Sequence, residues 1–104
     1  MQHLTPADFK QLIEQSGVQL LDVRTTDEVQ TATIGGAQHI PLDQLGQRVG
    51  ELAAQQTVAV YCHHGVRSER AGRILEKAGF DKVAHLAGGI DAWSDQIDPN
   101  IPKY

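Results

Sequence analysis

The sequence is poor in cysteine, because its 104 residues include a single one, Cys62. A lone cysteine cannot form a disulfide within the chain, which fits a reducing compartment. The chain also offers no second thiol that could resolve an oxidised Cys62. Any thiol that takes a group from this residue must therefore belong to another molecule.

Long apolar runs and an excess of positive charge are also missing. No stretch approaches the roughly 20 apolar residues that span a bilayer, and the first residues do not resemble a signal peptide. Lysine and arginine number 9 against 13 aspartate and glutamate, so the net charge is −4 and no basic field attracts nucleic acid or an anionic membrane. We therefore expect a cytoplasmic protein that binds neither of these partners.

The length suits one domain, residues 1–104, whose core needs neither a disulfide nor a structural metal. Short apolar runs predict strands at 18–23, 57–61 and 80–86, and a further short strand within 35–41. Helical spacing predicts helices at 5–16, 42–52, 68–77 and 90–93, and a turn or short helix at 25–28. This alternation predicts an α/β fold in which helices cover both faces of a central parallel sheet.

Three groups of chemically distinctive residues follow predicted strands. They are Asp22 to Arg24, Cys62 to Arg67 and Leu86 to Gly89. Because ligands of parallel sheets bind beyond the carboxyl ends of the strands, we expect these groups to lie along one edge.

Cys62 is the candidate nucleophile. It follows an apolar strand and precedes a predicted helix, so unpaired N–H groups and the positive end of the helix dipole would favour its thiolate. A lone cysteine at the end of a strand is most often a small buried hydrophobic residue. Gly65 and Arg67 behind it favour the nucleophile, because glycine permits a tight turn and arginine adds a fixed cation.

The loop after Cys62 supplies the predicted substrate-binding residues. Successive N–H groups could turn inward as a cradle for the sulfur, and Arg67 could bind an oxyanion leaving group through two parallel hydrogen bonds. His63 and His64 are adjacent and are expected to point in different directions, so we predict solvent-facing residues that tune substrate entry. The predicted set is His63, His64, Gly65, Val66 and Arg67, with no metal and no cofactor.

Charges near the first strand have two interpretations. Asp22 and Arg24 could orient a substrate. They could equally form an ion pair that links the strand to Glu28 or to the cysteine loop, because buried charges need partners. We therefore predict a structural role for both. Three further histidines are predicted to be surface or satisfied polar residues without a role: His3, His39 and His85.

Taken together, these segments resemble the rhodanese superfamily in its small single-domain form. The resemblance is carried by the Leu21–Arg24 segment, the Cys62–Ser68 loop and the Leu86–Trp93 segment, although Ala32-Thr33 stands where the family commonly has Gly-His. It implies a sulfurtransferase in which the Cys62 thiolate attacks a donor such as thiosulfate and becomes a persulfide. The sulfur then passes to a thiol or to cyanide.

The same residues leave other functions open. The protein could carry persulfide sulfur for a dedicated partner, such as a thioredoxin-like or sulfur-relay protein, or serve as a non-catalytic interaction module. Phosphatase or arsenate-reductase activity is disfavoured, because phosphoester-cleaving relatives resemble Cys-x5-Arg whereas Cys62 and Arg67 form Cys-x4-Arg. Arg70 and Arg73 could either solvate a helix or attract anionic sulfur donors.

Overall fold

A computed structural model describes residues 1–104. Its strands are β1 (Gln2–Leu4), β2 (Val18–Asp22), β3 (Gln38–His39), β4 (Thr57–Tyr61) and β5 (Val83–Leu86). Its helices are α1 (Pro6–Ile13), α2 (Thr26–Thr31), α3 (Leu42–Arg48), α4 (Val66–Lys77) and α5 (Gly89–Gln96), and a 3-10 turn, η1 (Val49–Glu51), follows α3. The strands form one sheet in the order β1-β5-β4-β2-β3, and every neighbouring pair is parallel. The predicted α/β fold is therefore confirmed.

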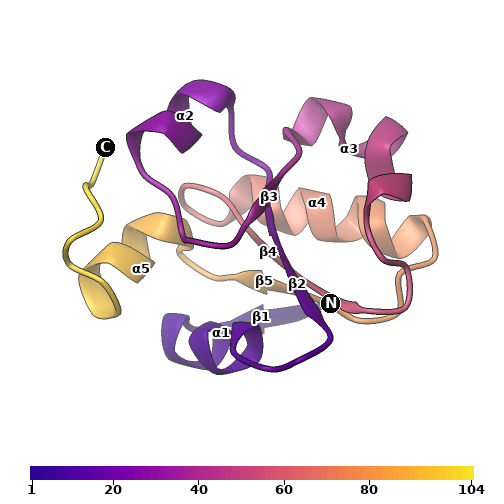
Figure 1. The fold of residues 1–104 in the computed structure, drawn as a ribbon, viewed down its shortest axis with the longest axis horizontal. Helices are drawn as coiled ribbons and strands as arrows, with labels where there is room; N and C mark the ends of the chain where they lie inside the picture. The colour runs from indigo at the N-terminus through magenta and orange to yellow at the C-terminus, as the bar shows by residue number, and fades with distance from the viewer.

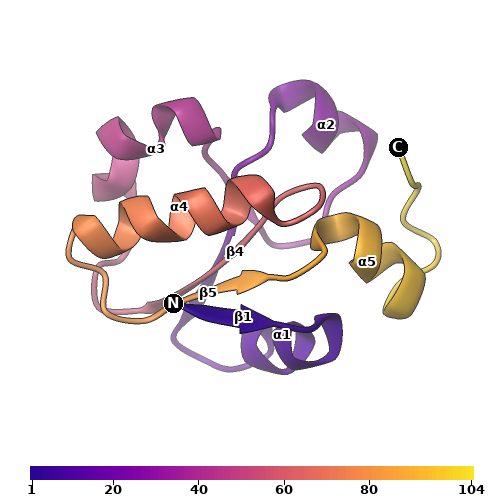
Figure 2. The same ribbon diagram turned by 180° about the vertical axis from the view of Figure 1, so that it is seen from behind.

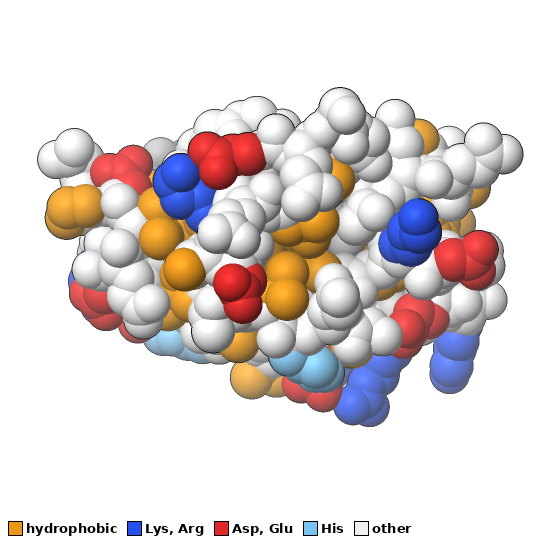
Figure 3. Space-filling view, turned by 90° about the horizontal axis from the view of Figure 1, so that it is seen from below, with side chains coloured by type: hydrophobic (Ala, Val, Ile, Leu, Met, Phe, Trp, Pro, Cys, Tyr) orange, Lys and Arg blue, Asp and Glu red, His pale blue; other side chains and the backbone are white.

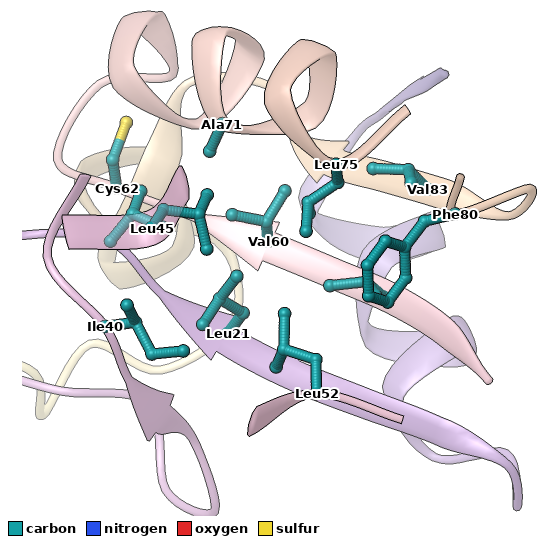
Figure 4. Close-up of a cluster of buried hydrophobic side chains, with 12 residues drawn as sticks. Leu21, Ile40, Leu45, Leu52, Val60, Cys62, Ala71, Leu75, Phe80 and Val83 are labelled. Carbon is teal, nitrogen blue, oxygen red and sulfur yellow. The ribbon is translucent and has the colours of Figure 1, made fainter. Parts of the chain in front are cut away.

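Helices cover both faces of the sheet (Figures 1 and 2), with α2, α3 and α4 on one side and α1 and α5 on the other. Each face has its own apolar core. Alternation along β4 separates the two, because Val58 and Val60 join the core beneath α3 and α4 while Ala59 and Tyr61 join the core beneath α1 and α5. The same alternation directs Cys62 to the α4 side, where it lies at one end of the cluster near the start of that helix (Figure 4).

Local signals fix where two of the helices begin. The Thr5 hydroxyl accepts a hydrogen bond from the Asp8 N–H, and Pro6 is the first residue of α1, as the sequence indicates. The segment after β2 forms α2, which begins with a reciprocal capping box between Thr25 and Glu28. This cap matters for function because it fixes the Glu28 side chain beside the cysteine loop.

Several predicted boundaries were wrong. The strand β1 was missed, because three residues with two exposed side chains carry no periodic signal. The last strand begins at Val83 rather than at residue 80, and α4 begins at Val66 rather than at Ser68. The helix expected over 42–52 divides into α3 and η1, a stretch in which Gly46 and Gly50 weaken the helix.

None of the helices has the length and apolar character needed to cross a membrane. Seen from below relative to Figure 1, one face of the molecule carries acidic and basic side chains interspersed around a band of apolar ones (Figure 3).

Candidate active site

Cys62 lies directly after β4 and is 1% exposed. Its Sγ accepts hydrogen bonds from two backbone amides, the N–H of Gly65 at 3.1 Å and the N–H of Ser68 at 3.2 Å. The second donor lies in the first turn of α4, which also directs the positive end of the helix dipole at the sulfur. Hydrogen bonds to the anion and a helix N-terminus both favour thiolate over thiol.

The predicted cradle is therefore narrower than expected. Of the residues from His63 to Arg67, only Gly65 donates its amide to the sulfur, and Ser68, just beyond that range, supplies the second donor. The helix α4 begins at Val66, two residues before the predicted start, and this places the Ser68 amide in its first turn.

Glycine is required at two points around this loop. Gly65 has a φ of 107°, and a Cβ there would lie 3.2 Å from the N of Gly88. Gly89 has a φ of 63°, and a Cβ there would overlap the carbonyl of His63. The first turn of α5 packs against the loop through this contact, and the Ile90 N–H donates to the Cys62 carbonyl at 2.9 Å. The Leu86–Gly89 segment thus lies beside the cysteine loop, as its position after a strand predicts.

Arg67 makes the two parallel hydrogen bonds that the sequence predicts, but its partner is Glu28 rather than a substrate. Its Nη1 and Nη2 donate to the two carboxylate oxygens at 2.6 and 2.8 Å. The hydrogen bonds from Arg67 outweigh the effect of burial and hold the pKa of Glu28 well below its usual range. The guanidinium fork is therefore occupied within the chain.

Asp22 and Arg24 form a buried ion pair at the end of β2, in agreement with the predicted structural role. Arg24 donates from Nε at 3.0 Å and from Nη2 at 2.7 Å to the two oxygens of Asp22, and Nη2 also donates to the Ala32 carbonyl at 2.7 Å. Burial disfavours the charge of Arg24, but its hydrogen bonds to Asp22 and Tyr104 reverse this effect and raise its pKa. Arg24 Nη1 also donates to the Glu28 backbone carbonyl at 3.4 Å, which joins the end of β2 to α2.

Tyr104 is a site residue that sequence reasoning missed. Its hydroxyl accepts from Arg24 Nη1 at 2.8 Å and donates to Glu28 Oε2 at 2.8 Å. Burial and the hydrogen bond to Glu28 raise the pKa of Tyr104 to about 12, although Arg24 opposes this shift. The residue lies 76 positions from Glu28, and no local pattern in the sequence connects them.

The prediction that His63 and His64 point in different directions was wrong. Their rings stack with centroids 3.8 Å apart, and the Tyr104 ring stacks on His63 at 3.9 Å. Burial and the neighbouring His64 lower the pKa of His63. His63 is half-buried in this stack, and only His64 faces solvent as predicted.

Two groups of side chains bring metal-ligating atoms within 4.8 Å of one another: His63, His64 and Asp91, and His3, Glu69 and His85. The sequence predicted neither group. His39, in contrast, is a satisfied polar residue as predicted, because its Nε2 lies 2.6 Å from the Arg24 carbonyl oxygen.

A cavity of about 430 Å³ lies beside the loop, and Arg67 and Arg70 supply cations to its wall. Leu42 and Ile74 give it an apolar side. Arg70 is exposed and makes no ion pair, whereas Arg73 pairs with Glu69 at 2.8 Å one helical turn away. Of the two arginines, only Arg70 lines this cavity, whereas Arg73 forms an ion pair on the surface of α4. Val66 is 69% exposed on the same helix.

Comparisons with known proteins agree with this geometry. The family model for the rhodanese-like domain matches residues 5–96. The thiosulfate sulfurtransferase GlpE of Shewanella oneidensis is 31% identical over 89% of this chain and 92% of its own length. YrkF of Bacillus subtilis, named provisionally as a sulfur carrier protein, is 36% identical over 86% of this chain. The match covers 49% of the length of YrkF, so this chain spans about half of that relative. A rhodanese-related protein of Thermoplasma volcanium has a crystal structure that matches with a TM-score of 0.86 at 27% identity over all of both chains.

Proposed function

Because this chain belongs to the rhodanese-like family, we propose that it is a sulfurtransferase that works through a persulfide on Cys62. The Cys62 thiolate attacks the outer sulfur of thiosulfate, the S–S bond of the donor breaks, and sulfite leaves with the electron pair of that bond. The terminal sulfur of the persulfide is then attacked by cyanide, which leaves as thiocyanate, or by a thiolate, which becomes a new persulfide. Each transfer restores the Cys62 thiolate, so no external oxidant or reductant is consumed.

The observation that carries this proposal is the pair of amides on Cys62 Sγ. Donors fixed in the folded protein stabilise the anion without reorganising during the reaction. Sulfite leaves as an anion, so the first transfer needs no general acid. The short Cys-x4-Arg loop and its narrow cradle suit one sulfur atom better than a phosphoryl group, which supports sulfur transfer over phosphatase or arsenate-reductase chemistry.

The charged residues around the loop have separate proposed roles. Arg67 is held by Glu28, so it contributes structure and a screened positive charge rather than a free fork. Arg70 is the unpaired cation of the adjoining cavity, and it would attract an anionic donor such as thiosulfate. His63, His64 and Val66 belong to the loop and remain predicted contacts for the incoming donor or acceptor.

A second candidate is a persulfide carrier that serves a dedicated protein partner. The resemblance to YrkF supports this alternative, and the lack of a second cysteine requires an external thiol acceptor in either case. The partner would be a thioredoxin-like or sulfur-relay protein. A carrier would load slowly from thiosulfate and rapidly from a protein persulfide, whereas an enzyme for small donors would show the reverse.

Steady-state turnover tests the proposal. Thiocyanate formation from thiosulfate and cyanide is expected with the wild type and should vanish in Cys62→Ser. A non-catalytic interaction module would produce no thiocyanate and would load from no persulfide donor. Equal thiocyanate formation by Cys62→Ser would overturn the role of the cysteine.

A further inference from the structure

His85 is a buried histidine with no predicted role, yet hydrogen bonds reach both of its ring nitrogens. It lies in β5 and is 4% exposed. Its Nδ1 is 2.9 Å from the Ser68 hydroxyl, and its Nε2 is 2.7 Å from Nδ1 of His3. His3 is exposed and stands in register with His85 on the neighbouring strand β1. Two rings therefore connect the surface to Ser68.

Ser68 connects this pair of histidines to the cysteine loop twice. Its backbone N–H donates to Cys62 Sγ at 3.2 Å, and its hydroxyl donates to the Gly65 carbonyl at 3.2 Å. Gly65 is the other residue whose amide binds the sulfur. The Ser68 side chain thus holds together the two residues that supply the donors to Cys62.

The direction of the hydrogen bonds follows from a count of protons. The Ser68 hydroxyl has one proton and the Gly65 carbonyl can only accept, so both bonds of this hydroxyl form together only when its proton goes to that carbonyl. His85 must then donate from Nδ1 to the Ser68 oxygen. In neutral His85 the Nε2 is bare, and it accepts the Nδ1–H of His3. Every donor in this chain of bonds points toward the cysteine loop, and aligned hydrogen bonds polarise one another.

We propose that His85, supported by His3, is a positioning residue that fixes Ser68 and thereby the two amides that stabilise the Cys62 thiolate. Ser68 is fully buried, so loss of its partner would leave a buried hydroxyl oxygen without a donor. The segment would then relax toward another partner and move an amide away from the sulfur. This inference rests on the proposed function only in taking Cys62 as the nucleophile.

The surroundings of His85 favour its neutral form. His3 faces it from β1, Glu69 faces it from α4, and the β4 residue in register with it, Val60, is apolar. Burial and the nearby His3 lower the pKa of His85, and Glu69 opposes this shift. Glu69 is itself paired with Arg73. Neutral His85 keeps the arrangement in which all donors point toward the loop.

The test is the rate of alkylation of Cys62 by iodoacetamide as a function of pH, which reports how readily the thiolate forms without any sulfur transfer. His85→Leu removes the donor to Ser68 and fills the buried position with an apolar side chain. His85→Asn keeps an amide N–H near the position of Nδ1. Ser68→Ala removes the connecting hydroxyl, and Ser94→Ala is the matched control, because Ser94 is also buried but its hydroxyl bonds to the Ile101 carbonyl.

We expect His85→Leu and Ser68→Ala to lower the rate of Cys62 alkylation at pH 7 severalfold, because displacement of an amide removes a hydrogen bond to the thiolate. His85→Asn should recover most of the rate, and Ser94→Ala should stay within about twofold of the wild type, because its hydroxyl is remote from the loop. If the alkylation rate of Ser68→Ala depended on pH in the same way as that of the wild type, the proposal would be overturned, even if His85→Leu failed to fold. Failure of the wild type to take sulfur from any donor would refute the proposed function and leave this test intact.

Discussion

Glu28 supplies the sharpest test of how the site is held together. Its carboxylate receives two hydrogen bonds from Arg67 and one from Tyr104, and it also accepts from the backbone and hydroxyl of Thr25. Glu28→Gln keeps the shape and can keep the capping box. It removes the negative charge and places an amide N–H group where an oxygen accepted from a neighbour.

The magnitude follows from burial. The side chain of Glu28 is 17% exposed and that of Arg67 is 32% exposed, so the unpaired guanidinium can be partly hydrated. The loss should therefore fall below the roughly 3–5 kcal/mol seen when a fully buried pair is broken. We expect Glu28→Gln to lower the free energy of unfolding by about 2 kcal/mol, the scale of a charge-assisted hydrogen bond. With a urea m-value of about 1–3 kcal/mol per molar, the midpoint should fall by about 1 M.

The pH dependence has a definite sign. Pairing with Arg67 lowers the pKa of folded Glu28 below the value of about 4.3 expected for the unfolded chain. The stabilisation is therefore fully present above that unfolded pKa and is lost as the pH falls toward the folded pKa. The difference between wild type and Glu28→Gln should be constant from pH 6 to 8 and should shrink at pH 3.

Urea unfolding followed by circular dichroism measures both effects. The matched control is Glu14→Gln, because Glu14 is an exposed glutamate paired with Lys10 at 3.0 Å, and surface pairs of this kind contribute about 0–1 kcal/mol. Equal midpoints for the two variants, or a difference that persists unchanged at pH 3, would refute the ion pair as a stabilising element of the site.

Three further predictions concern the rest of the site. Tyr104→Phe should lower the free energy of unfolding by about 1 kcal/mol, because the ring can still stack while the two hydrogen bonds of the hydroxyl are lost. Urea unfolding measures this loss, and an unchanged urea midpoint would contradict it. Arg70→Ala should raise the KM for thiosulfate severalfold in the thiocyanate assay, while Arg73→Ala should not, because Arg70 lines the cavity and Arg73 does not. Equal effects of the two substitutions would show that the cavity is not the route of the donor. Gly89→Ala should be strongly destabilising, because its Cβ would overlap backbone, whereas Gly46→Ala in open space within α3 should stabilise by about 0.5–1 kcal/mol; thermal unfolding of both variants checks the contrast.

The parts of the site that the sequence predicted are those set by local pattern. A β-branched run that ends at Cys62, followed by glycine and a helix, places the thiol at the end of a strand whatever the rest of the fold. The charged residues Asp22 and Arg24 lie at the end of another short, mostly apolar run, residues 18–21. Their position at the carboxyl edge of the sheet then follows from the parallel arrangement.

The parts that the sequence did not predict depend on contacts between distant segments. The partner of Arg67 lies 39 residues away, and a fork suited to an oxyanion is equally suited to a carboxylate of the same chain. The His3–His85 pair requires β1 and β5 to be neighbours, and β1 is too short to be recognised from its pattern. Tyr104 enters the site only because the chain after α5 returns to the loop.

The central claim is that Cys62 holds the sulfur in transit, and the mass of the intact protein tests it most directly. After incubation with thiosulfate, the wild type should gain the mass of one sulfur atom and lose it on addition of cyanide, with one thiocyanate released per sulfur lost. Cys62→Ser should gain nothing. A gain of sulfur by Cys62→Ser, or no gain by the wild type with thiosulfate or with any persulfide donor, would contradict the account.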